Sequence, residues 1–266
     1  MKAGDEDYRA YVGPLNRYEF MGVSQFRLLT TLGLRREHKI LDFGCGSLRC
    51  GKLLIPYLDS ENYYGQDPNG WLIEKGIKEE VGKEILSIKK PNFSNVGDFT
   101  VGFNERFDFV IAQSVFSHTD LTTTEKGLKS IYESLKDDGI ALVTIKEGVD
   151  YKGNEEWVYP ACTTFNPKTI NGIFKKYNMN AKRLYWFNPS QTWFAISKNK
   201  KNLPRLMDIL FLLGGEEVRS RQFSRQGFFG NRIYSALKKI SFLKKNKIIK
   251  NIGKKILGDI YNVYKK

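Results

Sequence analysis

A short apolar segment that runs directly into a glycine turn constrains the fold of this chain more than any other feature. Residues 38–51 read HKILDFGCGSLRCG. A buried strand, a tight turn and a helix in this order form the first unit of a parallel α/β sheet. Glycine lets the backbone approach a ligand, and amide groups at a helix start point toward it. The turn therefore predicts a cradle for an anion or a nucleotide.

The rest of the chain repeats this alternation of strand-like and helical segments. After the first strand at 38–43, we expect strands at 62–65, 93–96, 107–112 and 140–145, and a closing pair at 181–187 and 192–197. We expect helices at 18–34, from a cap at Ser47 to Leu58, from 69 to about 81, at 128–135 and at 166–177. The pattern predicts an α/β fold with a parallel sheet, and the closing pair predicts one antiparallel strand.

Charge divides the chain near residue 200. Residues 201–266 contain 16 Lys and Arg but 4 Asp and Glu, so they carry a net charge of +12 out of the total of +14. We therefore expect three parts: an N-terminal helical cap (1–37), a nearly neutral α/β domain (38–200) and a basic helical extension (201–266).

Composition excludes several classes of protein. The three cysteines and two histidines have no metal-ligand spacing, so we expect no metal site. The polar N-terminus does not resemble a signal peptide, and the longest apolar runs are too short to span a bilayer. These features predict a reduced, cytoplasmic protein.

The residues around the turn narrow the choice of ligand. A dinucleotide site needs a third glycine three residues after the second, but Ser47, Leu48 and Arg49 follow Gly46. Asp67 lies about 20 residues further on, at the end of the second strand, where a carboxylate can accept hydrogen bonds from both ribose hydroxyls. The pattern favours a ligand with ribose but without pyrophosphate.

Five ordered motifs carry a resemblance to a known family. The segments are LDFGCG, YYGQDPN, GDF, FDFVIAQSVFSH and LKDDGIALVTI. Together, over residues 38–198, they resemble the class I S-adenosylmethionine-dependent methyltransferases, with a glycine turn similar to that of a bacterial subgroup. The resemblance implies a Rossmann-like, seven-stranded, mostly parallel sheet with helices on both faces, and S-adenosylmethionine as the cofactor.

The resemblance also implies roles at the methionine end of the cofactor. Gly44 and Gly46, with Cys45 between them, would pass beneath the methionine part. Asp42 would orient its amino group through water. Gln113, at the end of the fourth strand, would lie near the sulfonium and the methyl group.

At the adenosine end, Asp67 would bind the ribose hydroxyls and Pro68 would lie beside the adenine. Asp98 would accept a hydrogen bond from the adenine amino group, and the Phe99 amide would meet a ring nitrogen. From the N-terminal segment, which is similar to that of the same subgroup, Tyr11 would close over the cofactor.

These assignments have structural alternatives. Asp42 could be only a strand-end acceptor, Asp67 and Asp98 could be ordinary turn residues, and Cys45 could be a packing residue. Leu48 stands where many members have glycine, which calls into question the close packing of the first helix.

The resemblance leaves the catalytic group open. If the acceptor is a hydroxyl, a general base helps, and His118 just beyond the fourth strand is the first candidate. The alternative is a histidine that only ties its loop to the neighbouring helix. Asp120 and Glu147 also follow strands at the same edge and are further candidates.

Several acceptor classes can be argued against. The segment AQSVF after the fourth strand lacks the Asn/Asp-Pro-Pro-aromatic motif of amino-methylating enzymes, the Pro-Cys of cytosine-C5 enzymes and the acidic ligands of metal-dependent catechol enzymes. A small molecule, a saccharide or a lipid remains. The loop at 147–165, with Trp157 and Tyr159 among carboxylates, can bind a sugar or can be an ordinary lid.

The basic extension suggests where the protein works. Residues 231–266 have apolar residues near helical spacing and lysines between them, so this segment can lie on an anionic membrane surface. Docking on a partner protein, contact with nucleic acid and a solvated helix are the alternatives; the neutral body argues against nucleic acid.

We expect O-methylation of a saccharide or lipid-linked glycan in bacterial surface polysaccharide assembly, by a cytoplasmic protein held peripherally at the inner face of the plasma membrane. The alternatives are methylation of RNA or another small molecule, and a non-catalytic scaffold that binds the cofactor and recruits partners.

Overall fold

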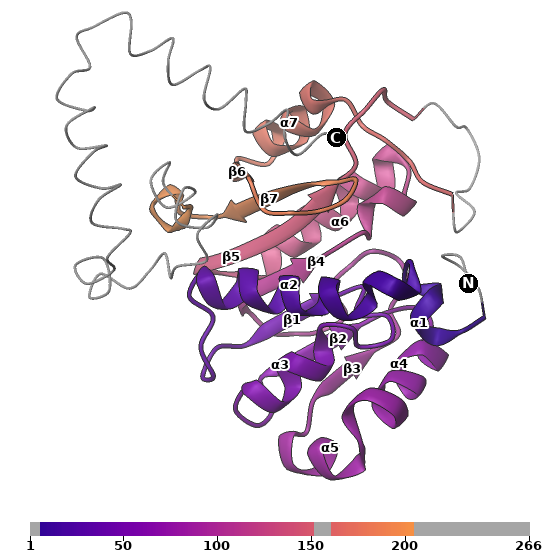
Figure 1. Cartoon of the computed structure of the whole chain (residues 1–266). Coiled ribbons are helices and arrows are strands. Elements are labelled where there is room, and N and C mark those ends of the chain that lie inside the picture. The colour runs from indigo at the N-terminus through magenta and orange to yellow at the C-terminus, as the bar shows by residue number, and fades with distance from the viewer. Residues whose placement is uncertain (1–5, 152–160, 205–266) are drawn as a thin grey trace, which may run out of the picture. The chain divides into compact units, whose positions relative to one another are not determined.

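The computed structural model of the chain describes residues 6–151 and 161–204, and Figure 1 shows their arrangement. The expected amphipathic helix at 231–266 lies outside the described residues, as do Trp157 and Tyr159. All described residues belong to the unit Met1–Arg219.

The described chain forms strands and helices that alternate along most of its length. The strands are β1 (Ile40–Phe43), β2 (Tyr63–Gln66), β3 (Asn92–Ser94), β4 (Phe107–Ala112), β5 (Leu135–Ile145), β6 (Asn180–Leu184) and β7 (Thr192–Ser197). The α-helices are α1 (Tyr8–Tyr11), α2 (Tyr18–Thr31), α3 (Gly51–Tyr57), α4 (Gly70–Gly76), α5 (Lys83–Lys89), α6 (Leu121–Ser134) and α7 (Pro167–Lys176). Short helical turns are η1 (Leu15–Arg17), η2 (Ile77–Val81), η3 (Phe116–His118) and η4 (Lys200–Asn202).

The strands form one seven-stranded sheet in the order β3-β2-β1-β4-β5-β7-β6. Neighbouring strands are parallel except at β7, which is antiparallel to both β5 and β6. The predicted mostly parallel sheet with one antiparallel strand is therefore confirmed. The order reverses between β1 and β4, and in such sheets ligands bind outside the carboxyl ends of the strands at this point.

Apolar side chains cover both faces of the sheet, as a parallel sheet requires. One core cluster includes residues of α2, α3 and α4, and the other includes residues of α6 and α7. Along β5, Ile140 and Leu142 join the first cluster while Ala141 and Val143 join the second, because successive side chains point to opposite faces.

Two expected helix starts were wrong. The helix expected at 128–135 begins at Leu121 as α6, and Leu135 already belongs to β5. Ser47 does not cap a helix, because α3 begins only at Gly51 and has no side-chain cap. The Ser47 backbone oxygen instead accepts a hydrogen bond from the Tyr18 hydroxyl at 3.0 Å. The Ser47 hydroxyl lies 3.2 Å from the same Tyr18 hydroxyl oxygen. The Ser47 side chain therefore contacts α2, which is remote in sequence, instead of capping the next helix as the local pattern predicted.

The glycine turn itself has left-handed backbone geometry at three positions. Gly44, Gly46 and Leu48 have φ of 76°, 52° and 61°. Leucine rarely adopts this region, since its Cβ crowds the carbonyl oxygen that follows. Leu48 is nonetheless fully buried, and Cβ atoms added at Gly51 and Gly76 would lie 3.1 and 2.9 Å from its side chain. Leucine is kept here by packing rather than by its backbone preference.

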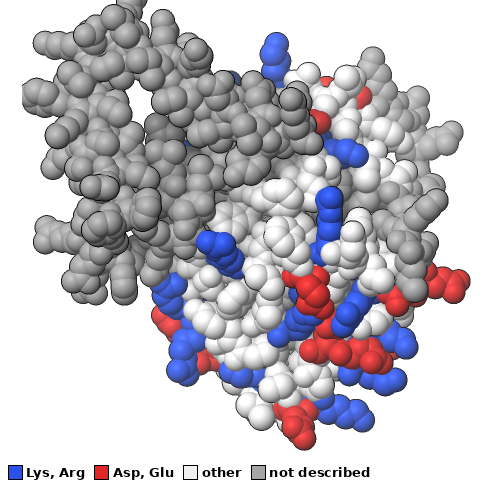
Figure 2. Space-filling model, in the orientation of Figure 1, with Lys and Arg blue, Asp and Glu red and all other residues white. Residues whose placement is uncertain are grey.

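Charges of both signs lie on the surface of the described residues. On the face in Figure 2, lysine and arginine side chains lie among aspartates and glutamates, so the described residues form no surface of a single charge there. Within residues 6–151 and 161–204, no helix combines the length and apolarity needed to cross a bilayer.

The strain at Leu48 predicts an unusual order of stability. Leu48→Ala loses buried surface and keeps the strained backbone, at a cost of roughly 2–5 kcal/mol. Leu48→Gly loses slightly more surface but relieves about 1 kcal/mol or more of strain. We expect the glycine variant to be the more stable of the two in denaturant unfolding. At Leu54, inside α3, the order should be reversed, because glycine destabilises a helix by about 1 kcal/mol relative to alanine. The same order at both positions would contradict the account.

Candidate functional site

A cavity of about 370 Å³ lies at the carboxyl ends of β1, β2 and β4. Most of the predicted site residues line it: Tyr11, Asp42, Gly44, Cys45, Gly46, Asp67, Pro68, Phe99, Gln113 and His118. They come from the N-terminal segment, from three strand ends and from the loops that follow them. The topology thus brings together side chains that lie more than a hundred residues apart in sequence.

Three predicted residues are not in the lining of this cavity. The Asp98 carboxylate accepts hydrogen bonds from the Thr100 amide at 2.9 Å and from Lys126 at 3.0 Å, and the Thr100 contacts, followed by Lys126, lower its pKa to about 2. Asp120 caps α6 by accepting from the Thr123 amide at 2.6 Å. Both carboxylates therefore have partners outside the lining of the cavity.

Glu147 is the third. Its carboxylate pairs with Arg183 and accepts a hydrogen bond from the Thr192 hydroxyl at 2.8 Å. This pair ties the end of β5 to β6 and β7. The roles that sequence assigned to Asp98, Asp120 and Glu147 stay predictions to which the geometry adds no support.

The glycine turn is bonded to the end of β2. The Gly44 amide donates to the Gln66 carbonyl at 2.7 Å, and the Gly46 amide donates to the Asp67 carboxylate at 3.0 Å. Asp67 also accepts from the Asn69 amide at 2.9 Å. Burial raises the pKa of Asp67 despite these hydrogen bonds. These hydrogen bonds fix the orientation of the Asp67 carboxylate in the cavity lining. A ligand that donates further hydrogen bonds to it would offset the cost of its burial.

Asp42 is more deeply buried, with 5% of its surface exposed. Burial raises its pKa to about 6, although the Tyr63 hydroxyl donates to it at 2.9 Å. A carboxylate with so little solvation favours a nearby positive charge. The ammonium group of an amino acid would supply one.

The N-terminal strap (residues 7–13, including α1) covers part of the cavity. Its Tyr11 and Val12 belong to the lining. The Tyr11 ring packs edge-on against Trp71 of α4 with centroids 5.3 Å apart, and the Val12 carbonyl accepts from Arg49 at 2.9 Å. The strap therefore contacts both α4 and the segment that follows the glycine turn.

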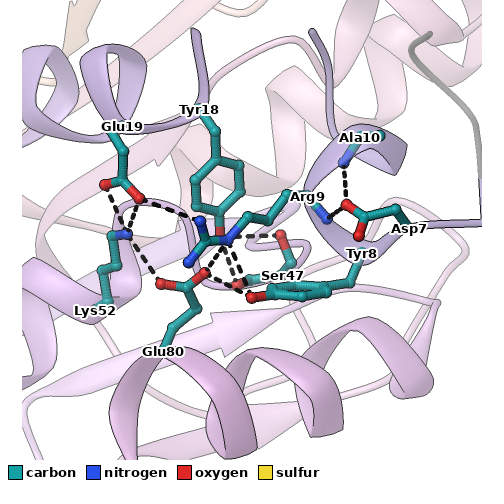
Figure 3. A network of polar contacts seen from close by, with 9 residues as sticks. All are labelled: Asp7, Tyr8, Arg9, Ala10, Tyr18, Glu19, Ser47, Lys52 and Glu80. Carbon is teal, nitrogen blue, oxygen red and sulfur yellow. Dashed lines mark hydrogen bonds and ion pairs between the residues drawn. The ribbon is translucent and has the colours of Figure 1, made fainter. Parts of the chain in front are cut away.

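A polar network fastens the strap, as Figure 3 shows. Glu80 of η2 is its centre: Arg9, Tyr8 and Lys52 all bond to its carboxylate, at 2.6, 3.0 and 2.9 Å. Burial alone would raise the pKa of Glu80, but the hydrogen bonds from Lys52, Arg9 and Tyr8 outweigh it and hold that pKa below its usual value. This buried carboxylate is satisfied within the chain.

Sequence reasoning missed several residues of the lining, among them Gln25 and Arg49. Arg49 follows the glycine turn directly, so its position in SLRC was a signal that could have found it. Gln25 lies on α2 and had none. The Oε1 atoms of Gln25 and Gln113 are buried and have no hydrogen-bond donor within the described part of the chain. Such atoms at a cavity point to a polar ligand.

The glycines of the turn also fit a ligand-binding cradle. A Cβ at Gly44 would lie 2.4 Å from Val115, and one at Gly46 would lie 2.7 Å from Val12. Neither position accepts a larger side chain, so the loop after β4 and the strap can lie directly against the turn. The cavity therefore combines a turn whose backbone a ligand can approach closely, carboxylates held in one orientation, and side-chain amide oxygens without hydrogen-bond donors.

His118 lies at the edge of the same cavity. Its Nδ1 is 2.9 Å from the Ala161 carbonyl oxygen. Because a carbonyl can only accept, Nδ1 carries the hydrogen, and Nε2 is the basic nitrogen of the neutral ring. Burial, together with the positive charge of Lys146, lowers the pKa of His118 although the Ala161 bond opposes this. The ring is neutral near pH 7.

Comparisons with known proteins agree with this geometry. Residues 41–141 match the model of a methyltransferase domain family. A search of the curated proteins finds no match. Solved structures are similar at low identity, and such a likeness shows the fold. Magnesium protoporphyrin IX methyltransferase from Synechocystis PCC 6803 with bound SAM is 14% identical, with a TM-score of 0.50 over 70% of this chain and 86% of that one.

Two further structures have the same fold. An S-adenosylmethionine-dependent methyltransferase from Clostridium acetobutylicum ATCC 824 is 12% identical, with a TM-score of 0.50 over 73% of this chain and 93% of that one. The glycopeptide N-methyltransferase MtfA with S-adenosyl-L-homocysteine is 11% identical, with a TM-score of 0.50 over 66% of this chain and 89% of that one.

Residues 41–141 therefore match a methyltransferase domain, and the described residues have the class I fold seen in S-adenosylmethionine-dependent methyltransferases. The cavity fits this cofactor. The Asp42 carboxylate can pair with its ammonium group, and the Asp67 carboxylate can accept hydrogen bonds from its ribose hydroxyls. The glycine turn has no side chains at Gly44 and Gly46 that would keep the cofactor away from the backbone. The individual contacts of these residues with the cofactor stay predictions.

The network around Glu80 predicts unequal effects of two similar substitutions. Glu80 has 4% of its side chain exposed and Glu19 has 62%, although both bind Lys52. Glu80→Gln leaves Arg9 and Lys52 without their buried partner, so we expect it to lower the free energy of unfolding by about 2–4 kcal/mol. Glu19→Gln should cost less than about 1 kcal/mol. Denaturant unfolding measures both, and similar losses would show that Glu80 does not fasten the strap.

Burial of Asp42 predicts a pH-dependent cost. The pKa of Asp42 is about 6 in the folded protein, above its unfolded value. Below about pH 4 the carboxyl is protonated in both states and burial costs little. As the pH rises to about 6, the unfolded state ionises first, and the free energy of unfolding falls. Asp42→Asn should remove this loss and raise the free energy of unfolding at pH 7 by on the order of 1–3 kcal/mol. Binding of S-adenosylhomocysteine should weaken in the same variant.

The control for this prediction is Asp137→Asn, at a fully exposed side chain. It should change neither stability nor binding. Calorimetric titration at pH 5 to 8 completes the test, since the wild type should bind less tightly as pH falls through about 6. An Asp42→Asn variant that is less stable at pH 7 would refute the account.

Proposed function

We propose that the enzyme O-methylates a hydroxyl group of a saccharide or lipid-linked glycan, in the assembly of a bacterial surface polysaccharide. The observation that carries the proposal is His118. Its ring lines the cofactor cavity, is neutral near pH 7 and has its hydrogen fixed on Nδ1 by the Ala161 carbonyl at 2.9 Å. A neutral imidazole in this orientation suits a general base for a hydroxyl acceptor.

When bound, S-adenosylmethionine supplies a methyl group on a positively charged sulfur. A hydroxyl oxygen is a weak nucleophile until its proton leaves, and Nε2 of His118 is the atom that would take this proton. The Ala161 bond keeps the ring in one tautomer and also stabilises the imidazolium that forms. A thioether or a tertiary amine would not need this group, so the histidine supports a hydroxyl acceptor.

Exposed aromatic rings on α2 and in the segment after β6 support a saccharide. Phe20 of α2 and Phe187, after β6, are 54% and 52% exposed, with ring centroids 5.5 Å apart. The neighbouring Trp186 donates to the Ser24 hydroxyl at 2.9 Å, which joins this segment to α2 beside Gln25. Adjacent exposed apolar side chains can mark a binding surface, and aromatic rings of this kind can stack on a sugar ring.

The charge of the C-terminal extension supports a lipid-linked acceptor. Residues 201–266 carry a net charge of +12, which would attract them to an anionic membrane by about 1 kcal/mol per lysine near the surface. The proposal includes a peripheral location at the inner face of the plasma membrane. An enzyme held there meets an acceptor that is itself anchored in the bilayer.

The test is methyl transfer to a panel of saccharides and lipid-linked glycans, followed as formation of S-adenosylhomocysteine. We expect turnover of at least one, and faster turnover of a lipid-linked acceptor on phosphatidylglycerol vesicles than on phosphatidylcholine vesicles. Failure with every hydroxylated acceptor would overturn the proposal. Equal rates on both kinds of vesicle would overturn the membrane part of it.

His118→Asn should lower kcat by 10²–10⁴-fold and leave the Kd of S-adenosylhomocysteine unchanged, because the amide keeps a donor toward Ala161 but supplies no base. For the wild type, kcat should rise with pH through the pKa of His118, below its ordinary value of 6.5, and then level off. The variant should lack this rise. The control is His38→Asn. The His38 ring accepts a hydrogen bond from the Arg35 amide and lies outside the cavity lining, so this variant should behave as the wild type.

A further inference from the structure

Four buried polar side-chain atoms of the described residues have no hydrogen-bond partner. They are Oε1 of Gln25, Gln113 and Gln191, and Nε1 of Trp193. Leaving a buried polar atom unpaired costs about 1–3 kcal/mol, so native proteins leave few of them without a reason. Three of the four are amide oxygens, which can only accept hydrogen bonds.

All four belong to one face of the sheet. Trp193 and Ile111 are members of the core cluster on the α2 side. Gln113 follows Ile111 by two residues and Gln191 precedes Trp193 by two, so the alternation of an extended chain directs them to the same side. Gln25 is part of α2, which covers this face (Figure 1). Gln25 and Gln113 line the cavity, and Gln191 is bonded to Ser114, which also belongs to the lining.

Gln191 is held in one orientation by the loop after β4. Its Nε2 donates to the Ser114 hydroxyl at 2.9 Å and to the Ser117 hydroxyl at 3.3 Å. With the amide nitrogen fixed on two serines, the oxygen is turned away from them. Ser114 lines the cofactor cavity next to Gln113, and Ser117 immediately precedes His118.

The backbone at Ser114 is strained in a way that supports this arrangement. Its φ is 61°, a left-handed value that a serine adopts at a cost of about 1 kcal/mol or more. The strain is supported by neighbours, since its amide donates to the Thr144 hydroxyl at 2.7 Å and its side chain accepts from Gln191. Strain of this kind is concentrated at sites that bind or react.

We propose that Gln191, together with Gln113, binds the hydroxyl groups of the acceptor that lie next to the methylated one. The two amide oxygens accept hydrogen bonds from these hydroxyls, and Gln191 acts as a positioning and specificity residue. This inference rests on the proposed function, because it concerns the same site. The acceptor it selects has several hydroxyl donors close together, as a saccharide does; an ether or an apolar aromatic compound leaves both oxygens unpaired.

Binding is tested first, without need of turnover. Protein labelled with ¹⁵N and saturated with S-adenosylhomocysteine is titrated with the methyl glycosides of glucose, galactose, mannose and rhamnose. The side-chain amide signal of Gln191 is assigned from its loss in Gln191→Leu. We expect at least one glycoside to shift this signal, and its fully O-methylated counterpart, which has no donors, to leave it in place. No shift with any glycoside, or equal shifts with both forms, would overturn the inference.

Kinetics then separate positioning from structural support, with a glycoside that is turned over. Gln191→Leu should raise the acceptor KM by at least tenfold and leave the KM of S-adenosylmethionine unchanged. Gln191→Glu keeps the acceptor oxygens but loses the donors to Ser114 and Ser117, and it should retain most of the acceptor affinity. If Gln191 only supported Ser114, both variants would fail alike, and the inference would be wrong.

The two proposals fail in distinguishable ways. A glycoside that shifts the Gln191 signal but is never methylated would sustain the binding inference and count against O-methylation of saccharides. A glycoside that is methylated while the Gln191 signal stays in place would sustain the proposed function and overturn the inference.

Discussion

The site depends on the hydrogen bonds that fix the glycine turn to the end of β2. The Gly44 amide is bonded to the Gln66 carbonyl and the Gly46 amide to the Asp67 carboxylate, at 2.7 and 3.0 Å. These two bonds fix the position of the glycine turn in the cavity lining and orient the Asp67 carboxylate. The absence of a Cβ at Gly44 lets the loop after β4 lie directly against the turn, because such an atom would be 2.4 Å from Val115. The same few backbone atoms therefore position the Asp67 carboxylate and the contact with the loop after β4.

Three buried carboxylates near this turn differ in what surrounds them. Burial raises the pKa of Asp42 and Asp67, because the hydrogen bonds they accept come from neutral groups and the charge of Arg49 offsets only part of the effect of burial on Asp42. Glu80 is also buried, but Arg9 and Lys52 hold its pKa low. A carboxylate with its cations in place stabilises the fold, whereas one without them costs stability until a ligand arrives. The comparison separates the fastening of the strap from the binding of the cofactor, although both use the same kind of residue.

Sequence reasoning predicted the central strands of the sheet well, because β1, β4 and β5 contain short apolar runs that are buried on both faces, and burial dominates their conformation. It failed where a remote contact overrode a local preference. Ser47 bonds to Tyr18 instead of capping a helix, and packing keeps Leu48 in a left-handed conformation that local propensity disfavours. Gln25 and Gln191 could not be found at all, because neither belongs to a motif. Only the topology places α2 and the start of β7 on one face of the sheet.

The two sides of the cavity also draw on different parts of the chain. The matched methyltransferase domain covers residues 41–141, which include the glycine turn, Asp67 and the loop with His118. The Ala161 carbonyl that orients His118, and the Gln191 amide that supports Ser114, both lie after it. The match to a methyltransferase domain therefore concerns the part of the cavity around the glycine turn and carries little information about the acceptor. Substitutions in the later segment can change which hydroxyls are bound without disturbing the hydrogen bonds of the glycine turn, so acceptor specificity can diverge on a constant cofactor site.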